Sequence, residues 1–305
     1  MVYHSGWRVG LASAPIHHGE ILQGIFWHKG QLTGGLVTLP CTIHATHASF
    51  IPARGEELTV SPAWKTKGRR AAQLAIEACV CLGDGPVGGH LVVTGDVPLC
   101  RGFGSSTSDV VAAIWAVQDA LVRPLRAEET ARIAVRAEAA SDSLMFKESS
   151  VLFAQREGEV IEDFGYRIPA LRVLGFGSRP ENRGRGIDTL AFPLARYDSA
   201  EIGVFAELQA MLREAIHTKD IALIGAVASA SSEINQRHLP ISCFDDLRAI
   251  VRETGALGIQ AAHSGDIAGL LFDRDDPEVG ARTEHGARLL HTIGIHEQWI
   301  FTAGD

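Results

Sequence analysis

The residues most able to do chemistry lie in a glycine- and hydroxyl-rich segment, Gly95–Asp109. It contains, in order, Gly102, Gly104, Ser105, Ser106 and Thr107. Glycines let the backbone turn sharply and approach a ligand closely, and the first amide N–H groups of a helix attract anions. The segment therefore predicts a phosphate cradle. A serine that merely caps a helix after a glycine turn fits the same spacing, and the residues alone leave both interpretations open.

The neighbours of this segment indicate how it is held. An apolar alternating run, Gly89–Thr94, leads into it and predicts a buried strand, and Val110–Val122 leads out of it and predicts a helix with little polar surface. A Walker loop is excluded, because the glycines are not followed by Gly-Lys-Ser/Thr. A dinucleotide fingerprint is excluded as well, because Thr107 stands where its third glycine belongs.

Two carboxylates downstream could complete a phosphoryl-transfer site, which needs a divalent cation and a group that orients or deprotonates the attacking hydroxyl. Glu138 and Asp142 are four residues apart and would share a face if the predicted helix Ala127–Glu138 continued through them. Mg²⁺ takes carboxylate and hydroxyl oxygens, so Glu138 pairs sensibly with Ser105 or Ser106. Asp142 would then face the substrate hydroxyl. Alternatively, Glu138 is a surface carboxylate and Asp142 a helix cap.

Near the N-terminus, two histidines and a glutamate form another polar group. A predicted first strand, Arg8–Ala14, is followed by His17, His18 and Glu20, and the Gly19-Glu20 pair breaks the strand pattern beside a turn. From the residues alone, this segment is either a solvated hairpin corner or part of a binding pocket.

The remaining pattern alternates strands and helices without an internal repeat. Helices are predicted over Arg70–Leu82, Ala200–His217, Asp220–Glu233, Cys243–Glu253 and Pro277–Leu290. Strands are predicted over Gln31–Pro40, Thr42–Phe50, Val151–Gln155, Glu159–Ile161, Leu171–Phe176, Asp188–Phe192 and Gln298–Thr302, and Gly258–Phe272 is a glycine turn that feeds a strand. The loop Gly177–Gly186 carries Arg179, Arg183 and Arg185, and is either a phosphate-seeking lid or a solvated loop. The order suits an α+β protein.

The segment Pro98-Leu-Cys-Arg-Gly-Phe-Gly-Ser-Ser106 resembles the Pro-x-x-x-Gly-Leu-Gly-Ser-Ser motif of the GHMP kinases (galacto-, homoserine, mevalonate and phosphomevalonate kinases), with Phe103 in place of leucine. Four strings look especially like the L-threonine kinase branch linked to cobalamin assembly. They are Gly19-Glu-Ile-Leu-Gln-Gly24, Ser-Ser-Thr-x-Asp at Ser105–Asp109, the Ala-Glu-x-x-x-Asp-Ser string around Glu138, and Ala262-His-Ser-Gly265. The last departs from the family, whose third motif is usually Gly-x-Gly-Gly.

This resemblance implies an α+β, two-domain GHMP kinase fold. Residues 1–165 would form the ATP-binding domain and residues 166–305 a ferredoxin-like domain, with the active site in the cleft between them. It further implies ATP and Mg²⁺ as cofactors, and transfer of the γ-phosphate to a hydroxyl of a small polar metabolite. An amino acid, L-threonine or a homologue such as homoserine, is the leading acceptor, and a hydroxylated intermediate of specialised metabolism is the second.

The resemblance also assigns residues to roles. The nucleotide side comprises Pro98, Arg101, Gly102, Phe103, Gly104, Ser105, Ser106 and Thr107, and the acceptor side comprises His17, His18, Glu20, His263 and Ser264. Glu138 with Ser105 or Ser106 would bind Mg²⁺, and Asp142 would act as the catalytic base. Arg101 could bind phosphate oxygens bidentately, or could simply be solvated.

Composition limits the partners. The net charge of −8 argues against a nucleic-acid partner, and a run of roughly 18 apolar residues, as a membrane span requires, is absent from the sequence. Five cysteines, an odd number spread along the chain, favour reduced thiols. We therefore expect a soluble, cytoplasmic enzyme of small molecules, and the sequence leaves a homodimer open.

Two rival functions share the expected fold. A diphosphomevalonate decarboxylase would need a basic pocket for its substrate, whereas the first motif here is rich in histidine and glutamate. A ligand sensor that has lost catalysis is disfavoured because Glu138, Asp142 and the serine pair are intact.

Overall fold

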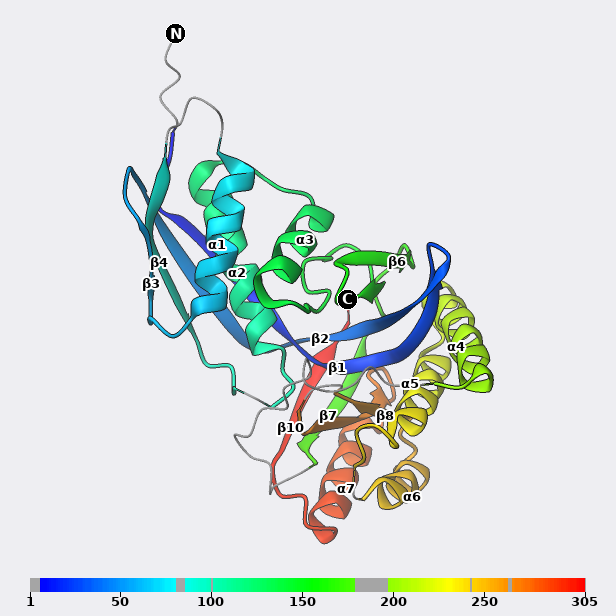
Figure 1. Cartoon of the computed structure of the whole chain (residues 1–305). Helices are drawn as coiled ribbons and strands as arrows, with labels where there is room; N and C mark the ends of the chain where they lie inside the picture. Colours follow the sequence, from blue (N-terminus) through cyan, green and yellow to red (C-terminus); the bar gives the residue numbers. More distant parts are fainter. Residues whose placement is uncertain are drawn as a thin grey trace.

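A curled ten-stranded sheet with helices packed against it forms the molecule (Figure 1). The computed structural model describes residues 6–80, 86–99, 101–178, 197–241, 243–262 and 265–304. The strands are β1 (Gly10–His28), β2 (Gln31–Arg54), β3 (Leu58–Ser61), β4 (Val87–Gly95), β5 (Val151–Ala154), β6 (Glu159–Asp163), β7 (Leu171–Gly177), β8 (Gly258–Ala261), β9 (Ile267–Asp273) and β10 (Gln298–Ala303). The helices are α1 (Thr66–Cys79), α2 (Ser105–Leu121), α3 (Ala127–Glu138), α4 (Ser199–Thr218), α5 (Ile221–Asn235), α6 (Phe244–Thr254) and α7 (Val279–Thr292).

The strand order is β10-β7-β9-β8-β1-β2-β4-β3, with β5 beside β2 and β6 beside β5. The two longest strands, β1 and β2, pair antiparallel and run through the middle of the molecule (Figure 1). β1 meets β8 at one pair, Glu20 with Ala261. The sheet thus passes from one predicted domain into the other through β1, and the division at residue 165 stays a prediction.

The expected break at Gly19-Glu20 is wrong, because β1 continues through it to His28. The register with β2 shifts between His17 and Glu20, where Gly19 adopts a left-handed φ of 65°. An irregularity of this kind is a bulge, which re-aims side chains without ending the strand. The alternation before the glycine and the segment Leu22–Phe26 after it therefore belong to one element.

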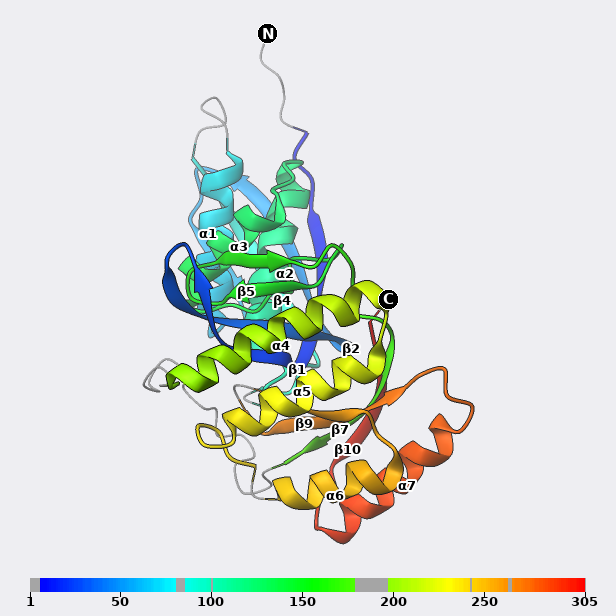
Figure 2. The same ribbon diagram turned by 90° about the vertical axis from the view of Figure 1, so that its right-hand side faces the viewer.

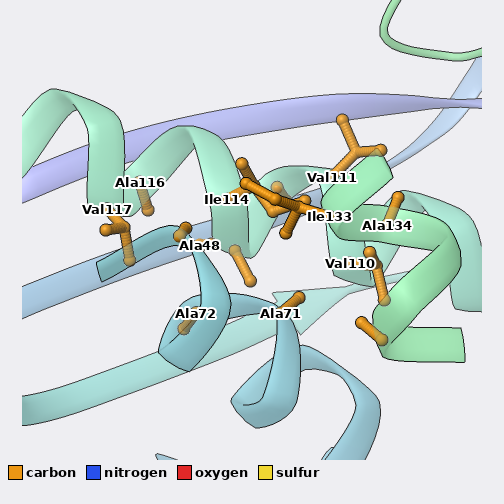
Figure 3. Packing of buried hydrophobic residues seen from close by; sticks show 14 of the residues in the cluster. Ala48, Ala71, Ala72, Val110, Val111, Ile114, Ala116, Val117, Ile133 and Ala134 are labelled. Carbon is orange, nitrogen blue, oxygen red and sulfur yellow. The ribbon is translucent and has the colours of Figure 1, made fainter. Parts of the chain in front are cut away.

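Helices α1, α2 and α3 lie together on one face of the β1–β2–β4–β3 part of the sheet (Figure 1). Small residues make this packing close. Ala71 and Ala72 of α1 belong to the same buried cluster as Val110 and Ile114 of α2 (Figure 3). The prediction that α2 has little polar surface is confirmed, and this burial makes the helix a rigid support for the glycine loop that precedes it.

The other helices cover the opposite part of the sheet. α4 and α5 pack against β1, and α6 and α7 pair near β7–β9 (Figure 2). Ser231 and Asn235 of α5 hydrogen-bond the backbone of Gln23 in β1. β1 is therefore held from both halves of the chain.

Most predicted elements are confirmed with small changes of boundary. The predicted helix Arg70–Leu82 starts earlier, at Thr66, and Gly258–Phe272 forms two strands, β8 and β9. The predicted strand Asp188–Phe192 and the arginines of the Gly177–Gly186 loop lie outside the described residues. Cys41, Cys79 and Cys243 are free thiols, as expected. None of the helices in the described ranges is both long and apolar enough to cross a membrane.

Candidate active site

The phosphate loop joins β4 to α2 and ends at Gly104. Gly104 is the N-cap of α2 and has a left-handed backbone, with φ 65° and ψ 33°. A Cβ on this residue would lie 2.1 Å from Cδ2 of His17 and 3.2 Å from Oδ2 of Asp142. Both the backbone conformation and the close approach therefore require glycine. The alternative of a serine cap is wrong, because α2 begins at Ser105 and the described residues provide it with no side-chain cap.

Two hydroxyl groups in the first turn of α2 meet the carboxylate at the end of α3. Ser106 Oγ donates to Glu138 Oε2 at 2.5 Å, and Thr107 Oγ1 donates to Glu138 Oε1 at 2.9 Å. The predicted pairing of Glu138 with a loop serine is thus present for Ser106. Ser105 is half-buried beside it, and its role in metal binding stays a prediction.

Glu138 is buried rather than on the surface, and burial raises its pKa to about 7, with the nearby charge of Asp142 adding to the rise. Thr107 Oγ1 also lies 3.1 Å from Oδ2 of Asp142. One hydroxyl has one proton, so Thr107 can donate to a single carboxylate at a time. The shared contact is favourable for both when one of the two carboxyl groups carries a proton, which agrees with the raised pKa of Glu138.

A loop, and not the continued helix that the sequence suggests, positions Asp142 in the site. Helix α3 ends at Glu138, and Ala139 has a left-handed φ of 70°, so the two carboxylates do not share a helical face. The loop that follows brings Asp142 back to α2, where its backbone N–H donates to Thr107 Oγ1 at 3.3 Å. Thr107 therefore joins Glu138 to Asp142.

His17 and Glu20 approach Asp142 from β1. Nε2 of His17 lies 2.9 Å from Oδ2 of Asp142, and Nδ1 lies 3.6 Å from Oε1 of Glu20. His17 is fully buried and Glu20 is 3% exposed, so a solvated hairpin corner is excluded. These three residues are close enough to be considered as metal ligands. However, the two ring nitrogens face different carboxylates, an arrangement of charge contacts rather than of chelation.

His18 points to the other side of β1. It is fully buried against the rings of Phe103, Trp299 and Phe301, and its Nδ1 lies 2.8 Å from Oε1 of Gln260. Burial lowers the pKa of His18 to about 4, so the ring is neutral near pH 7. This environment separates His18 from the His17–Asp142 contact, and its predicted role on the acceptor side stays a prediction.

The guanidinium of Arg101 forms ion pairs with two carboxylates. Its Nε donates to Asp266 Oδ1 at 2.6 Å, and its terminal nitrogens donate to the two oxygens of Glu297 at 3.0 and 2.9 Å. Its carbonyl also accepts from the N–H of Asp266 at 3.0 Å. Arg101 is therefore buried in an ion-pair network rather than solvated, and this network ties the phosphate loop to β9 and β10. Phosphate binding by its guanidinium stays a prediction.

Two lysines at the start of α1 were not predicted as site residues. Lys67 Nζ donates to Ser106 Oγ at 3.1 Å, and Lys65 pairs with Asp109 in α2. A pocket of about 640 Å³ beside them is lined by residues that include Lys67, Arg69 and Arg70. Cations in the first turn of a helix oppose its dipole. This was the signal that could have predicted a negatively charged partner at this position.

Among the remaining predicted residues, Pro98 is half-buried, whereas Gly102 and Phe103 are buried in the loop. His263 and Ser264 lie outside the described residues. The structure thus brings Gly104, Ser106, Thr107, Glu138, Asp142, His17 and Glu20 together.

Comparison with known proteins indicates the class of protein to which this chain is similar. Residues 69–146 match the family model described as the GHMP kinases N terminal domain. The crystal structure of homoserine kinase from Cytophaga hutchinsonii superposes with a TM-score of 0.67 at 15% identity, covering 99% of this chain and 96% of that one. The chain is thus similar to the GHMP kinases in this segment and in its fold, and these matches support an ATP-dependent phosphotransferase that acts on a hydroxyl group.

Similarity in sequence extends over most of the chain. It is 29% identical to the L-threonine kinase of Citrobacter freundii over 282 residues, which cover 89% of each protein. It is 24% identical to the L-threonine kinase of Salmonella typhimurium over 281 residues, covering 89% of this chain and 86% of that protein. The predicted resemblance to the L-threonine kinase branch is confirmed.

Proposed function

We propose that this protein transfers the γ-phosphate of ATP to the side-chain hydroxyl of a small amino acid, with L-threonine as the first candidate. The two L-threonine kinases to which the chain is similar support this choice of acceptor. A hydroxylated intermediate of specialised metabolism remains the alternative acceptor, because His17 and His18 make the first motif differ from the common pattern of the family.

One observation carries the proposal, namely that Thr107 in the first turn of α2 contacts both Glu138 and Asp142. Phosphates would lie over the loop glycines and the exposed N–H groups of α2, where anions bind well. Lys67, in contact with Ser106, would supply positive charge there. The nucleotide would extend into the pocket beside Lys67.

The residues present fit a magnesium ion. Glu138 and Ser106 place a carboxylate and a hydroxyl oxygen 2.5 Å apart, and these are the hard ligands that Mg²⁺ prefers. When bound, the ion would neutralise charge on the phosphate oxygens.

Asp142 would handle the proton of the acceptor. The acceptor oxygen forms a bond to the γ-phosphorus, the bond from that phosphorus to the ADP oxygen breaks, and the hydroxyl proton passes to the Asp142 carboxylate. Oδ2 of Asp142 is held by Thr107 at 3.1 Å and lies 2.9 Å from Nε2 of His17. These contacts give Asp142, the proposed base, a defined position next to Gly104 of the phosphate loop.

The test is an ADP-release assay with Mg²⁺ and ATP across L-threonine, D-threonine, L-serine, L-homoserine and diphosphomevalonate, with products identified by phosphorus NMR. We expect L-threonine to stimulate ADP release and to yield a phosphate monoester. Asp142→Asn should lower kcat by about 10²- to 10⁴-fold, the usual contribution of a general base.

The rivals give other outcomes in the same assay. Release of CO₂ from diphosphomevalonate would identify a decarboxylase. ATP or amino-acid binding without ADP release from any acceptor would identify a sensor. An Asp142→Asn variant as active as the wild type would show that Asp142 is not the base.

A further inference from the structure

Two adjacent histidines in β1, His17 and His18, are both fully buried but have different surroundings. His18 lies among aromatic rings and contacts Gln260. His17 lies between two carboxylates, with Nε2 2.9 Å from Asp142 and Nδ1 3.6 Å from Glu20. Packing alone does not explain why a histidine is buried between two carboxylates at the end of the phosphate loop.

The absence of a side chain at Gly104 makes room for the His17 ring beside the phosphate loop. The position of a Cβ on Gly104 is 2.3 Å from Nε2 of His17 and 3.2 Å from Oδ2 of Asp142. The His17–Asp142 contact therefore lies directly against the backbone at which α2 and the phosphate loop meet. A movement of the His17 ring would displace either Asp142 or this glycine.

The charges are complementary as well. Each ring nitrogen of His17 faces a carboxylate oxygen, at 2.9 Å and 3.6 Å. A ring with a proton on each nitrogen is cationic, and both carboxylates would attract it. One such cation would lie between Glu20 and Asp142 and offset their repulsion. It would also keep the Asp142 side chain turned toward the loop.

We propose that His17 is the positioning residue of the base: it holds Asp142 as a correctly oriented carboxylate, and Glu20 holds His17 in turn. The acceptor does not touch His17 in this scheme, which differs from the acceptor-binding role expected from the sequence. This inference rests on the proposed function, because it assigns the base role to Asp142.

The experiment uses the full-length enzyme with ATP, Mg²⁺ and L-threonine, and compares His17→Asn with His17→Gln. An asparagine amide replaces Nδ1 but is too short to reach Asp142, whereas a glutamine amide reaches the position of Nε2. His18→Asn is the matched control, because it is the same change in the neighbouring buried histidine. Each variant is also made in the Asp142→Asn background, and thermal melting shows which variants are folded.

We expect His17→Asn to lower kcat by about 10- to 100-fold, a part of the effect of a general base, while KM for ATP changes by less than about twofold. His17→Gln should recover kcat to within about fivefold of the wild type. In the Asp142→Asn background, His17→Asn should cost nothing more, because residues that act as one unit are not additive. His18→Asn should lower kcat by the same factor in both backgrounds.

Two results would overturn the inference. One is a fold-loss of kcat from His17→Asn that is equally large in the wild-type and in the Asp142→Asn backgrounds. The other is a rise in KM for L-threonine with kcat unchanged, which would make His17 an acceptor ligand. If His17→Asn does not fold, the same comparison is made with His17→Gln, whose kcat must then stay near the wild-type value. A wild-type enzyme that no acceptor stimulates, or an active Asp142→Asn variant, contradicts the proposed function instead.

Discussion

The buried carboxylate of Glu138 should make the metal-free protein less stable at alkaline pH, and Glu138→Gln should remove this effect. Burial raises the pKa of Glu138 from 4.5 to about 7. The side chain accepts hydrogen bonds from Ser106 and Thr107. A glutamine has nearly the same shape and does not ionise. It can keep both contacts, because its amide NH₂ can donate to one of the two hydroxyl groups while its carbonyl oxygen accepts from the other. The substitution therefore isolates the charge.

The sign follows from proton linkage. Because the pKa is higher in the folded state, the folded protein binds more protons than the unfolded chain between pH 4.5 and about 7, so stability falls as pH rises through this range. At 1.36 kcal/mol per pKa unit, the upper limit of this loss is about 3 kcal/mol at pH 8 and about 1 kcal/mol at pH 5.5. Relative to the wild type, Glu138→Gln should thus gain about 2 kcal/mol between these two pH values.

The assay is urea unfolding of both proteins, free of Mg²⁺ and nucleotide, at pH 5.5 and pH 8. Contributions that do not depend on pH cancel in the difference between the two conditions. A second pair of curves with Mg²⁺ and ATP should stabilise the wild type at pH 8 more than the variant, because the variant lacks the charged ligand. An equal stability difference at both pH values would refute the argument that Glu138 is held in an unfavourable, desolvated state.

Two further predictions concern the phosphate loop and the lysine of α1 that contacts it. Gly104→Ala should lower the unfolding free energy by about 2 to 5 kcal/mol, as judged by urea unfolding, because a Cβ meets the His17 ring and the left-handed backbone disfavours alanine. Gly34→Ala is the control, since a Cβ there meets nothing within 4 Å. Lys67→Met should raise KM for ATP by about tenfold and leave kcat less affected, because Lys67 contacts Ser106 beside the pocket. Initial rates at varied ATP check this, and an unchanged KM would exclude Lys67 from nucleotide binding.

Local signals predicted those parts of the site that neighbouring residues determine. Val110–Val122 is apolar enough to indicate a buried helix, and Ala127–Glu138 has a helical period and ends where α3 ends. The pairing of Glu138 with a loop serine could also be predicted, because Mg²⁺ chemistry limits the choice of ligands. The fold class followed from the order of such elements, together with a family motif.

Contacts between distant segments could not be predicted in this way. Asp142 was expected to share a helical face with Glu138, but the helix ends first and Thr107 makes the connection instead. The Arg101 network depends on Asp266 and Glu297, which are more than 150 residues further along the chain. Helical spacing and strand alternation describe neighbours on one element and carry no information on such pairs.

The bulge in β1 shows how one local irregularity can organise the whole site. In a regular strand, His17 and Glu20, three residues apart, would face opposite sides of the sheet. The register shift between them, with Gly19 in the left-handed region, turns Glu20 to the side of His17. A Cβ on Gly19 would lie 1.9 Å from Gln260 Nε2, so the same glycine also allows β8 to approach β1. The residue that looked like the end of a strand is thus what lets β1 present a histidine and a carboxylate together toward Asp142.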